Sequence, residues 1–126
     1  MKIELYVPTA IDVGILQRVR DVCIDRWGGC TLHAMGHGFW KDDAGKVESE
    51  RVEILSVLID TAEWERKHRD GEWNQTLHDV RQWFDNVSSW LRVKGNQHTV
   101  LYSIDGQPRY IGKDTIITPT PTGLEG

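Results

Sequence analysis

Two histidines, His33 and His37, stand in a glycine-containing segment that reads Leu-His-Ala-Met-Gly-His-Gly-Phe-Trp. An imidazole can act as a general base near neutral pH, can ligate a metal, or can contact an anion when it is protonated. As a general base, either histidine would need a carboxylate to orient it, and Glu50 or Glu53 could supply that group from a neighbouring strand. Nothing in the sequence fixes this pairing, so the catalytic residues are unknown and enzymatic activity stays open.

Cys30, His33 and His37 have a spacing that superficially resembles half of a zinc site. A strand rises about 3.3 Å per residue, so the Cα atoms of the two histidines would lie roughly 13 Å apart. Zinc needs donor atoms only about 2.1 Å away, and Cys30 would point to the face opposite His33. We therefore expect no metal within one chain and no cofactor, although a site across a dimer interface stays open.

Aromatic residues are the second chemical feature, because the chain has 6 tryptophans among its 126 residues. Trp27, Trp83 and Trp90 have helical spacings that favour packing in a core. Trp40, Trp64 and Trp73 fall at the end of an element or in an interrupted helical segment, where an indole could stack on a flat heterocycle. The same residues would also suit a protein interface rich in tryptophan.

Arginines could complete a ligand site by contacting a phosphate, and Arg51, Arg66 or Arg109 could supply that contact. The ligand-binding residues that we predict are His33, His37, Trp40, Arg51, Trp64 and Arg109.

Apolar spacing predicts the elements that must position these residues. In chain order they are a strand over 3–7, a helix that Thr9 or Asp12 caps and Gly28 ends, strands over 30–40 and 47–59, a short helix over 61–68, a helix over 74–92, a strand over 99–104 and a brief strand over 109–111. This order predicts an α+β fold, a ferredoxin-like βαββαβ sandwich in which two main helices cover one face of a four-stranded antiparallel sheet. We place this domain at residues 1–111 and expect residues 112–126, which are rich in proline and polar residues, to form a flexible tail.

The strand over 47–59 is apolar on both faces near its end. Val52, Ile54 and Leu58 alternate with Leu55 and Val57. If the helices cover one face, the other needs a cover from outside the domain, and homodimerisation through the sheet would provide it. The alternative is that the short helix or the C-terminal segment folds over this face.

Small residues decide which face of the strand over 30–40 meets a helix. Ala34, Gly36 and Gly38 share one side and would let a helix approach closely, so we expect both His33 and His37 to face away from the helices. This second side is the ligand face that we predict. The glycines could instead mark a β-bulge, which would change which side chains share a face.

Net charge, cysteine content and apolar runs restrict the kinds of partner and the cellular location that we expect. The net charge of −4 provides no basic stripe for a nucleic-acid backbone, so a polyanion is an unfavourable partner while a small anion is not. Two cysteines do not form a disulfide framework, and no apolar run reaches the roughly 20 residues that cross a membrane. The first residues lack the layout of a secretory signal, and we expect a cytoplasmic protein.

Three segments together resemble small uncharacterised proteins of bacterial and phage genomes. They are Arg26-Trp27-Gly28-Gly29-Cys30-Thr31, Gly36-His37-Gly38-Phe39-Trp40 and Val100-Leu101-Tyr102-Ser103-Ile104-Asp105-Gly106, and they follow an initial Lys-Ile-Glu-Leu-Tyr-Val-Pro strand. The resemblance spans most of residues 1–111 and implies a ferredoxin-like fold with no established reaction.

By analogy, the resemblance implies a phage anti-defence protein in the host cytoplasm. We expect a homodimeric protein that binds a small anionic ligand and sequesters a nucleotide-type signalling molecule. The alternatives are a hydrolase of the phosphodiesterase type that acts on such a nucleotide, and a protein-interaction or inhibitor module.

Overall fold

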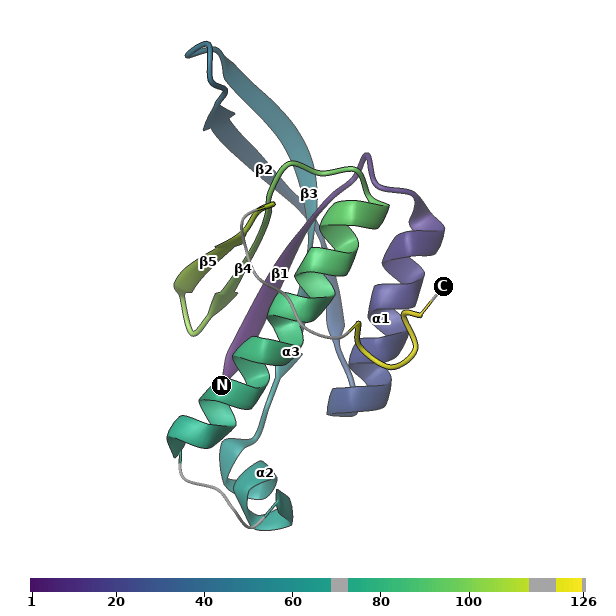
Figure 1. Ribbon diagram of the computed structural model, residues 1–126, viewed down its shortest axis with the longest axis vertical. Helices are drawn as coiled ribbons and strands as arrows, with labels where there is room; N and C mark the ends of the chain where they lie inside the picture. Colours follow the sequence, from purple (N-terminus) through teal and green to yellow (C-terminus); the bar gives the residue numbers. More distant parts are fainter. Residues whose placement is uncertain (69–72, 114–119, 126) are drawn as a thin grey trace.

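One antiparallel sheet organises the chain, which the computed structural model describes over residues 1–68, 73–113 and 120–125. Within these residues the sheet has five strands in the spatial order β2-β3-β1-β4-β5, and three helices accompany it (Figure 1). The elements are β1 (Lys2–Pro8), α1 (Val13–Trp27), β2 (Thr31–Lys41), β3 (Val47–Leu58), α2 (Thr61–His68), α3 (Trp73–Lys94), β4 (Val100–Ile104) and β5 (Gln107–Ile111). The α+β class and the antiparallel sheet are as the sequence predicted.

Local signals set the limits of α1. The Asp12 carboxylate accepts a hydrogen bond of 2.8 Å from the Gly14 N–H, which makes Asp12 the N-cap rather than Thr9. At the other end Gly28 has a φ of 88° and its N–H donates to the Ile24 carbonyl. A glycine adopts this left-handed conformation without the penalty that a Cβ would bring, so the helix ends there.

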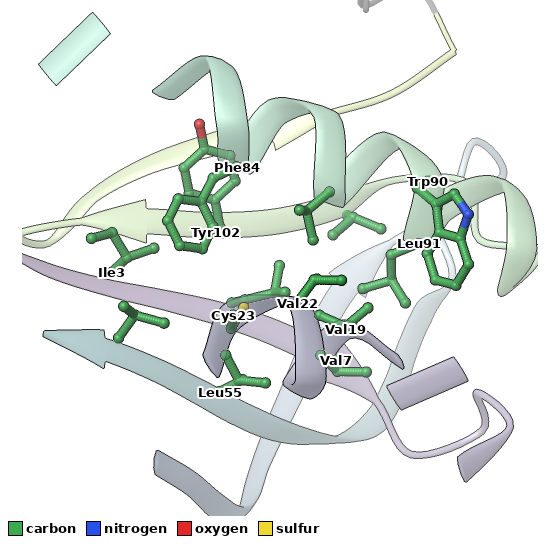
Figure 2. Packing of buried hydrophobic residues seen from close by; sticks show 14 of the residues in the cluster. Ile3, Val7, Val19, Val22, Cys23, Leu55, Phe84, Trp90, Leu91 and Tyr102 are labelled. Carbon is green, nitrogen blue, oxygen red and sulfur yellow. The ribbon is translucent and has the colours of Figure 1, made fainter. Parts of the chain in front are cut away.

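The core lies between the sheet and the two long helices, α1 and α3, which pack on the same face of it (Figures 1 and 2). Leu5 in the central strand β1 and Phe84 in α3 are fully buried, and so is Tyr102 in β4. Alternate residues of each strand point to opposite faces, so this core uses only half of the strand residues. The other half forms a second face of the sheet, which we call the open face.

The β4–β5 hairpin adds a strand to the sheet. Asp105 and Gly106 have φ angles of 48° and 83°, the two positive values that the commonest two-residue hairpin turn requires. β5 pairs with β4 along its whole length, and Ile111 at its end is fully buried. The prediction of a four-stranded sheet is therefore wrong, because the short segment after the turn is a complete fifth strand.

The C-terminal segment packs against α1 where the structure describes it. Leu124 is fully buried, and the Arg18 guanidinium donates to the carbonyls of Gly123 at 3.5 Å and Glu125 at 3.2 Å. A Cβ at Gly123 would lie 2.8 Å from a methyl group of Val22, so the chain passes very close to the helix. The prediction of a flexible tail over residues 112–126 is corrected for residues 120–125, since they bury an apolar anchor.

No helix in the described part of the chain is both long enough and apolar enough to cross a membrane.

Candidate functional site

A β-bulge separates the two histidines of β2. His33 lies opposite Ile54 of β3, whereas Gly36 lies opposite Val52, so β2 has one residue more than β3 in this interval. Past the bulge, His37 lies opposite Arg51. Because residues directly opposite each other share a face, His33 lies on the open face and His37 on the face that carries the helices. The expectation that both histidines share one ligand face is therefore wrong.

His37 and Arg51 are brought together by this register. They are cross-strand partners in the part of the β2–β3 hairpin that projects beyond the rest of the sheet (Figure 1). The imidazole of His37 also stacks on the ring of Phe39, with ring centroids 5.7 Å apart and planes inclined by 25°. A cation beside two flat rings suits an anionic or aromatic group.

The two carboxylates that could orient a histidine, Glu50 and Glu53, also lie on opposite faces of the sheet. Glu53 lies two residues beyond Arg51 and shares the helix side with His37, whereas Glu50 lies opposite Gly38 and belongs to the open face. Partial burial raises the pKa of Glu50 above its ordinary value. A histidine–carboxylate pair therefore has to combine His37 with Glu53, because His33 and Glu50 are four ladder positions apart on their strand pair.

A groove lies between α1 and the hairpin on the helix side of the sheet. Its volume is about 300 Å³. Leu32 of β2 and Glu53 of β3 line one wall, and the outer stripe of α1 from Val13 to Arg20 lines the other. Thr9 also lines the groove, and its N–H donates to the Arg51 carbonyl at 2.9 Å, so the backbone of Arg51 lies next to a groove residue.

Arg109 has a structural partner. Its Nε and Nη2 atoms donate to the two carboxylate oxygens of Asp85 at 2.6 and 2.7 Å, and the Tyr102 hydroxyl donates to the same carboxylate at 2.6 Å. Asp85 belongs to α3, so the cluster ties this helix to β4 and β5. Burial and the hydrogen bond to Asp85 raise the pKa of Tyr102, and the same carboxylate raises the pKa of Arg109. The arrangement fixes Arg109 in the fold, away from His37.

Two of the tryptophans, like Arg109, have structural partners within the fold. Trp27 and Trp83 meet edge to face with ring centroids 5.5 Å apart, and Trp27 stacks on Phe84 at 6.0 Å, so these residues belong to the packing of the helices. The side chains of Trp40 and Trp64 lie outside the described residues. Of the six predicted ligand residues, the described part of the structure brings together His37 and Arg51.

The open face carries a feature that was not predicted from the sequence. One continuous cross-strand row runs over all five strands, because each member lies directly opposite the next in the sheet register. The row consists of Tyr110, Leu101, Tyr6, Ile54 and His33. Tyr110 is 66% exposed, and the period-2 alternation of the strands was the signal that could have revealed the row.

The neighbouring rows on β1 and its partner strands hold small side chains and one pair of opposite charges. Glu4 lies between Ser56 and Ser103 in the next row, and these serines are only 5% and 6% exposed. Lys2 lies opposite Leu58, which is 74% exposed. The ammonium group of Lys2 is 4.0 Å from the Glu4 carboxylate. Lys2 and Glu4 are thus the formally charged residues on the described open face of β1, and their charges cancel.

Metal-ligating and nucleophilic groups do not converge in the described residues. No cluster of three histidine, cysteine or carboxylate side chains there could hold a metal ion. Cys23 is buried, and this burial raises the pKa of its thiol to about 12. Such a thiol stays protonated near neutral pH and is a poor nucleophile.

A larger hollow of about 530 Å³ lies between α1 and α3. Asp25, Asp79 and Trp83 are among its lining residues, and residues 120–122 form a further wall. Residues 114–119, which come directly before that wall, are outside the described residues. We therefore assign no role to this hollow.

No known protein family, curated protein or solved structure matches this chain.

Proposed function

We propose that the protein is a protein-interaction module that forms a homodimer by packing two open sheet faces against each other. The observation that carries this proposal is the row of Tyr110, Leu101, Tyr6, Ile54 and His33, which crosses each of the five described strands. Aromatic and aliphatic side chains that line up across a sheet form the kind of surface that a second sheet covers at a spacing of about 10 Å.

The charge pattern favours a second copy as the partner. The chain carries a net charge of −4, so two copies repel each other unless the contact surface is close to neutral. On the central strand, Lys2 and Glu4 supply one charge of each sign, and the other open-face carboxylates of the hairpin, Glu48 and Glu50, lie on its projecting part. In a two-fold interface the Lys2 of one copy can meet the Glu4 of the other, so the two charges attract each other across the contact.

The apolar surface available is substantial. Leu58 and Tyr110 are 74% and 66% exposed on this face. Covering a large apolar side chain is worth about 1.5–3 kcal/mol, and each residue of a two-fold interface contributes twice. The dimer therefore gains from residues that add little to the stability of a single copy.

The strand order supports a ferredoxin-like core as part of the same proposal. β1, α1, β2, β3, α3 and β4 follow a βαββαβ order, and their strands lie side by side as β2-β3-β1-β4. On this view α2 and β5 are additions to the sandwich. A two-layer sandwich of this kind leaves one sheet face for an external partner.

Sedimentation-velocity measurements over a range of protein concentrations test the dimer. Tyr110→Glu places a carboxylate at an exposed position of the row, so we expect it to weaken self-association by about tenfold or more without unfolding the chain. Val93→Glu is the matched control, because Val93 is 63% exposed on α3 and lies on the other side of the molecule. It should leave the association unchanged.

A monomeric wild-type protein at every accessible concentration would contradict this function, and so would equal effects of the two variants. A charge-reversal experiment gives a second test of the dimer. If Lys2 of one copy meets Glu4 of the other, the single variants Lys2→Glu and Glu4→Lys weaken the dimer, and combining them in one chain restores it.

A second candidate function is the binding of a small anionic ligand of nucleotide type, for which the His37–Arg51 pair beside the groove is the specific support. Native mass spectrometry with a panel of cyclic and linear nucleotides tests it. Intact ligand recovered after denaturation would favour sequestration, including an anti-defence role in a host cytoplasm, and a changed mass would favour a hydrolase. Loss of a bound nucleotide in Arg51→Ala but not in Arg109→Ala would locate the site.

A further inference from the structure

The strand β2 forms one edge of the sheet. Within the described residues it pairs with β3 along one side, and its other side has no strand partner. On that outer side, alternate residues present backbone N–H and C=O groups that a further strand can bind. β2 runs from Thr31 to Lys41, which makes it a long edge.

Among the described residues, side chains on the helix side of this edge strand are largely exposed. The register places Leu32, His37, Phe39 and Lys41 on this side. Leu32 is 47% exposed and Phe39 is 70% exposed, although they share a face with the buried core of the neighbouring strands. An uncovered strip of side chains therefore follows the unpaired backbone of β2.

The groove beside Leu32 can receive one side chain of an added strand. Val13, which is 66% exposed, and Leu16 line its helix wall, and Ile11 is a further lining residue. A volume of about 300 Å³ exceeds the size of a single leucine side chain, so the groove can hold an apolar residue together with water.

The charges along this strip are mainly positive in an acidic protein. Arg51 and Lys41 share the helix side with His37, and Glu53 is the carboxylate of β3 on the same side. Glu48 and Glu50 lie opposite Trp40 and Gly38 and belong to the open face. A partner that follows the strip is therefore favoured when it carries carboxylates.

We propose that β2 and the adjoining groove bind an extended acidic peptide segment, which adds a further strand to the sheet at this edge and inserts one apolar side chain between Leu32 and α1. Main-chain hydrogen bonds to the edge supply affinity, and the groove and the basic strip supply selectivity. This binding site is separate from the dimer face, because its side chains lie on the opposite side of the sheet.

The bulge between His33 and Gly36 limits this pairing. It divides the edge into two short ladders, Thr31–His33 beside the groove and Gly36–Lys41 along the projecting hairpin. Bulges are one of the devices by which proteins keep an exposed edge from pairing without discrimination. We therefore expect micromolar affinity that depends on the groove.

Fluorescence anisotropy with synthetic peptides tests the proposal on the full chain. The probes are labelled peptides with the sequence Thr-Leu-Thr-Glu-Thr-Glu-Thr and its reverse, so that either strand direction is represented. Their leucine and glutamates share one face of a strand, as the groove and the basic strip require. We expect one of them to bind, and its counterpart with lysine in place of glutamate to bind about tenfold more weakly.

N-methylated peptides give the control for strand pairing. Methylating the threonine nitrogens blocks one edge of the peptide, and methylating the leucine and glutamate nitrogens blocks the other. Strand addition requires that one of these peptides loses binding and that the other keeps it. Equal binding of both, or no binding of any probe below about 1 mM, would overturn the proposal.

Protein variants locate the site. Leu32→Glu should weaken peptide binding by about tenfold or more and leave self-association unchanged, while Val93→Glu should affect neither. Peptide binding that survives in Tyr110→Glu would show that the edge works without the dimer. If Leu32→Glu alters the sedimentation of the protein alone, the edge is a contact between copies and the peptide proposal is wrong.

Discussion

The two faces of the sheet differ in how completely the side chains of its five described strands are covered. On the helix-covered face, Leu5, Leu55 and Tyr102 are 0–1% exposed, and the one polar group among them, the Tyr102 hydroxyl, has a carboxylate partner. On the open face, neighbouring positions of the same strands hold Tyr6, Ile54 and other residues that remain partly or fully exposed. On the central strands the first face is therefore packed within one copy and the second is not, whereas the edge strand β2 keeps Leu32 and Phe39 exposed on the helix side as well.

This difference separates stability from function. A covered apolar residue contributes to the free energy of unfolding of a single chain, whereas an exposed one contributes only when a partner covers it. Substitutions on the two faces should therefore change different measured quantities. Matched pairs of residues on one strand give the most direct comparison.

The largest expected effect comes from two leucines of β3. Leu55 is 1% exposed on the covered face and Leu58 is 74% exposed on the open face. Leu55→Ala removes buried methyl groups and leaves a cavity, so we expect a loss of about 2–5 kcal/mol in the free energy of unfolding. Leu58→Ala should change it by less than about 0.5 kcal/mol in dilute protein. Urea denaturation followed by circular dichroism measures both.

Repeating the two measurements at several protein concentrations distinguishes the two faces further. If two open faces meet in a dimer, the cost of Leu58→Ala grows as the protein concentration rises, because unfolding then includes dissociation. The cost of Leu55→Ala should not change in this way. A large effect of Leu58→Ala in dilute protein would show that the open face is covered within one chain.

A medium effect is expected from the polar anchor of the covered face. Tyr102→Phe removes the hydroxyl that donates to Asp85, and a typical hydrogen bond to a charged group contributes about 1.5–3 kcal/mol. It leaves the aromatic packing against Phe84, with ring centroids 5.8 Å apart, in place. The measurement is again the free energy of unfolding near neutral pH.

The same variant should change the response to alkaline pH. Burial, together with the Asp85 contact, raises the pKa of Tyr102 in the folded chain, while the unfolded tyrosine titrates near pH 10. The contribution of this group is therefore complete below about pH 10 and is lost above it by up to about 1.4 kcal/mol per pH unit, because only the unfolded chain releases the proton. The difference between wild type and Tyr102→Phe should shrink accordingly above pH 10. A constant difference would show that the hydroxyl is not held in its neutral form.

Regular elements could be predicted from the sequence because their signals are local. Alternation gave β1 and β3, helical spacing gave α1 and α3, and the cap at Asp12 and the stop at Gly28 follow from single residues. The assignment of Leu55 and Val57 to one face of β3 and of Ile54 to the other agrees with the sheet register. These features depend on neighbouring residues, so a sequence pattern carries them.

Features that depend on distant contacts were not predicted. The bulge in β2 is decided by how the strand matches β3, and glycines on both sides of His37 permit either outcome, so the face of that histidine could not be assigned. Arg109 was assigned to a ligand because its partner Asp85 lies 24 residues away on a helix. Leu124 is a single apolar residue in a polar segment, and no periodicity reports its burial against α1.

The smallest expected effect tests the bulge itself, through the two histidines that it places on opposite faces. His33→Glu adds a carboxylate to the end of the open-face row and should weaken the dimer by a few fold, since the end of a row lies near the rim of an interface. His37→Glu adds the same group beside Arg51 on the helix side, so it should leave sedimentation unchanged and weaken the binding of the acidic peptide. Each histidine thus serves as the control for the other in both assays. If both variants weakened self-association equally, the two histidines would share a surface and the bulge would not separate them.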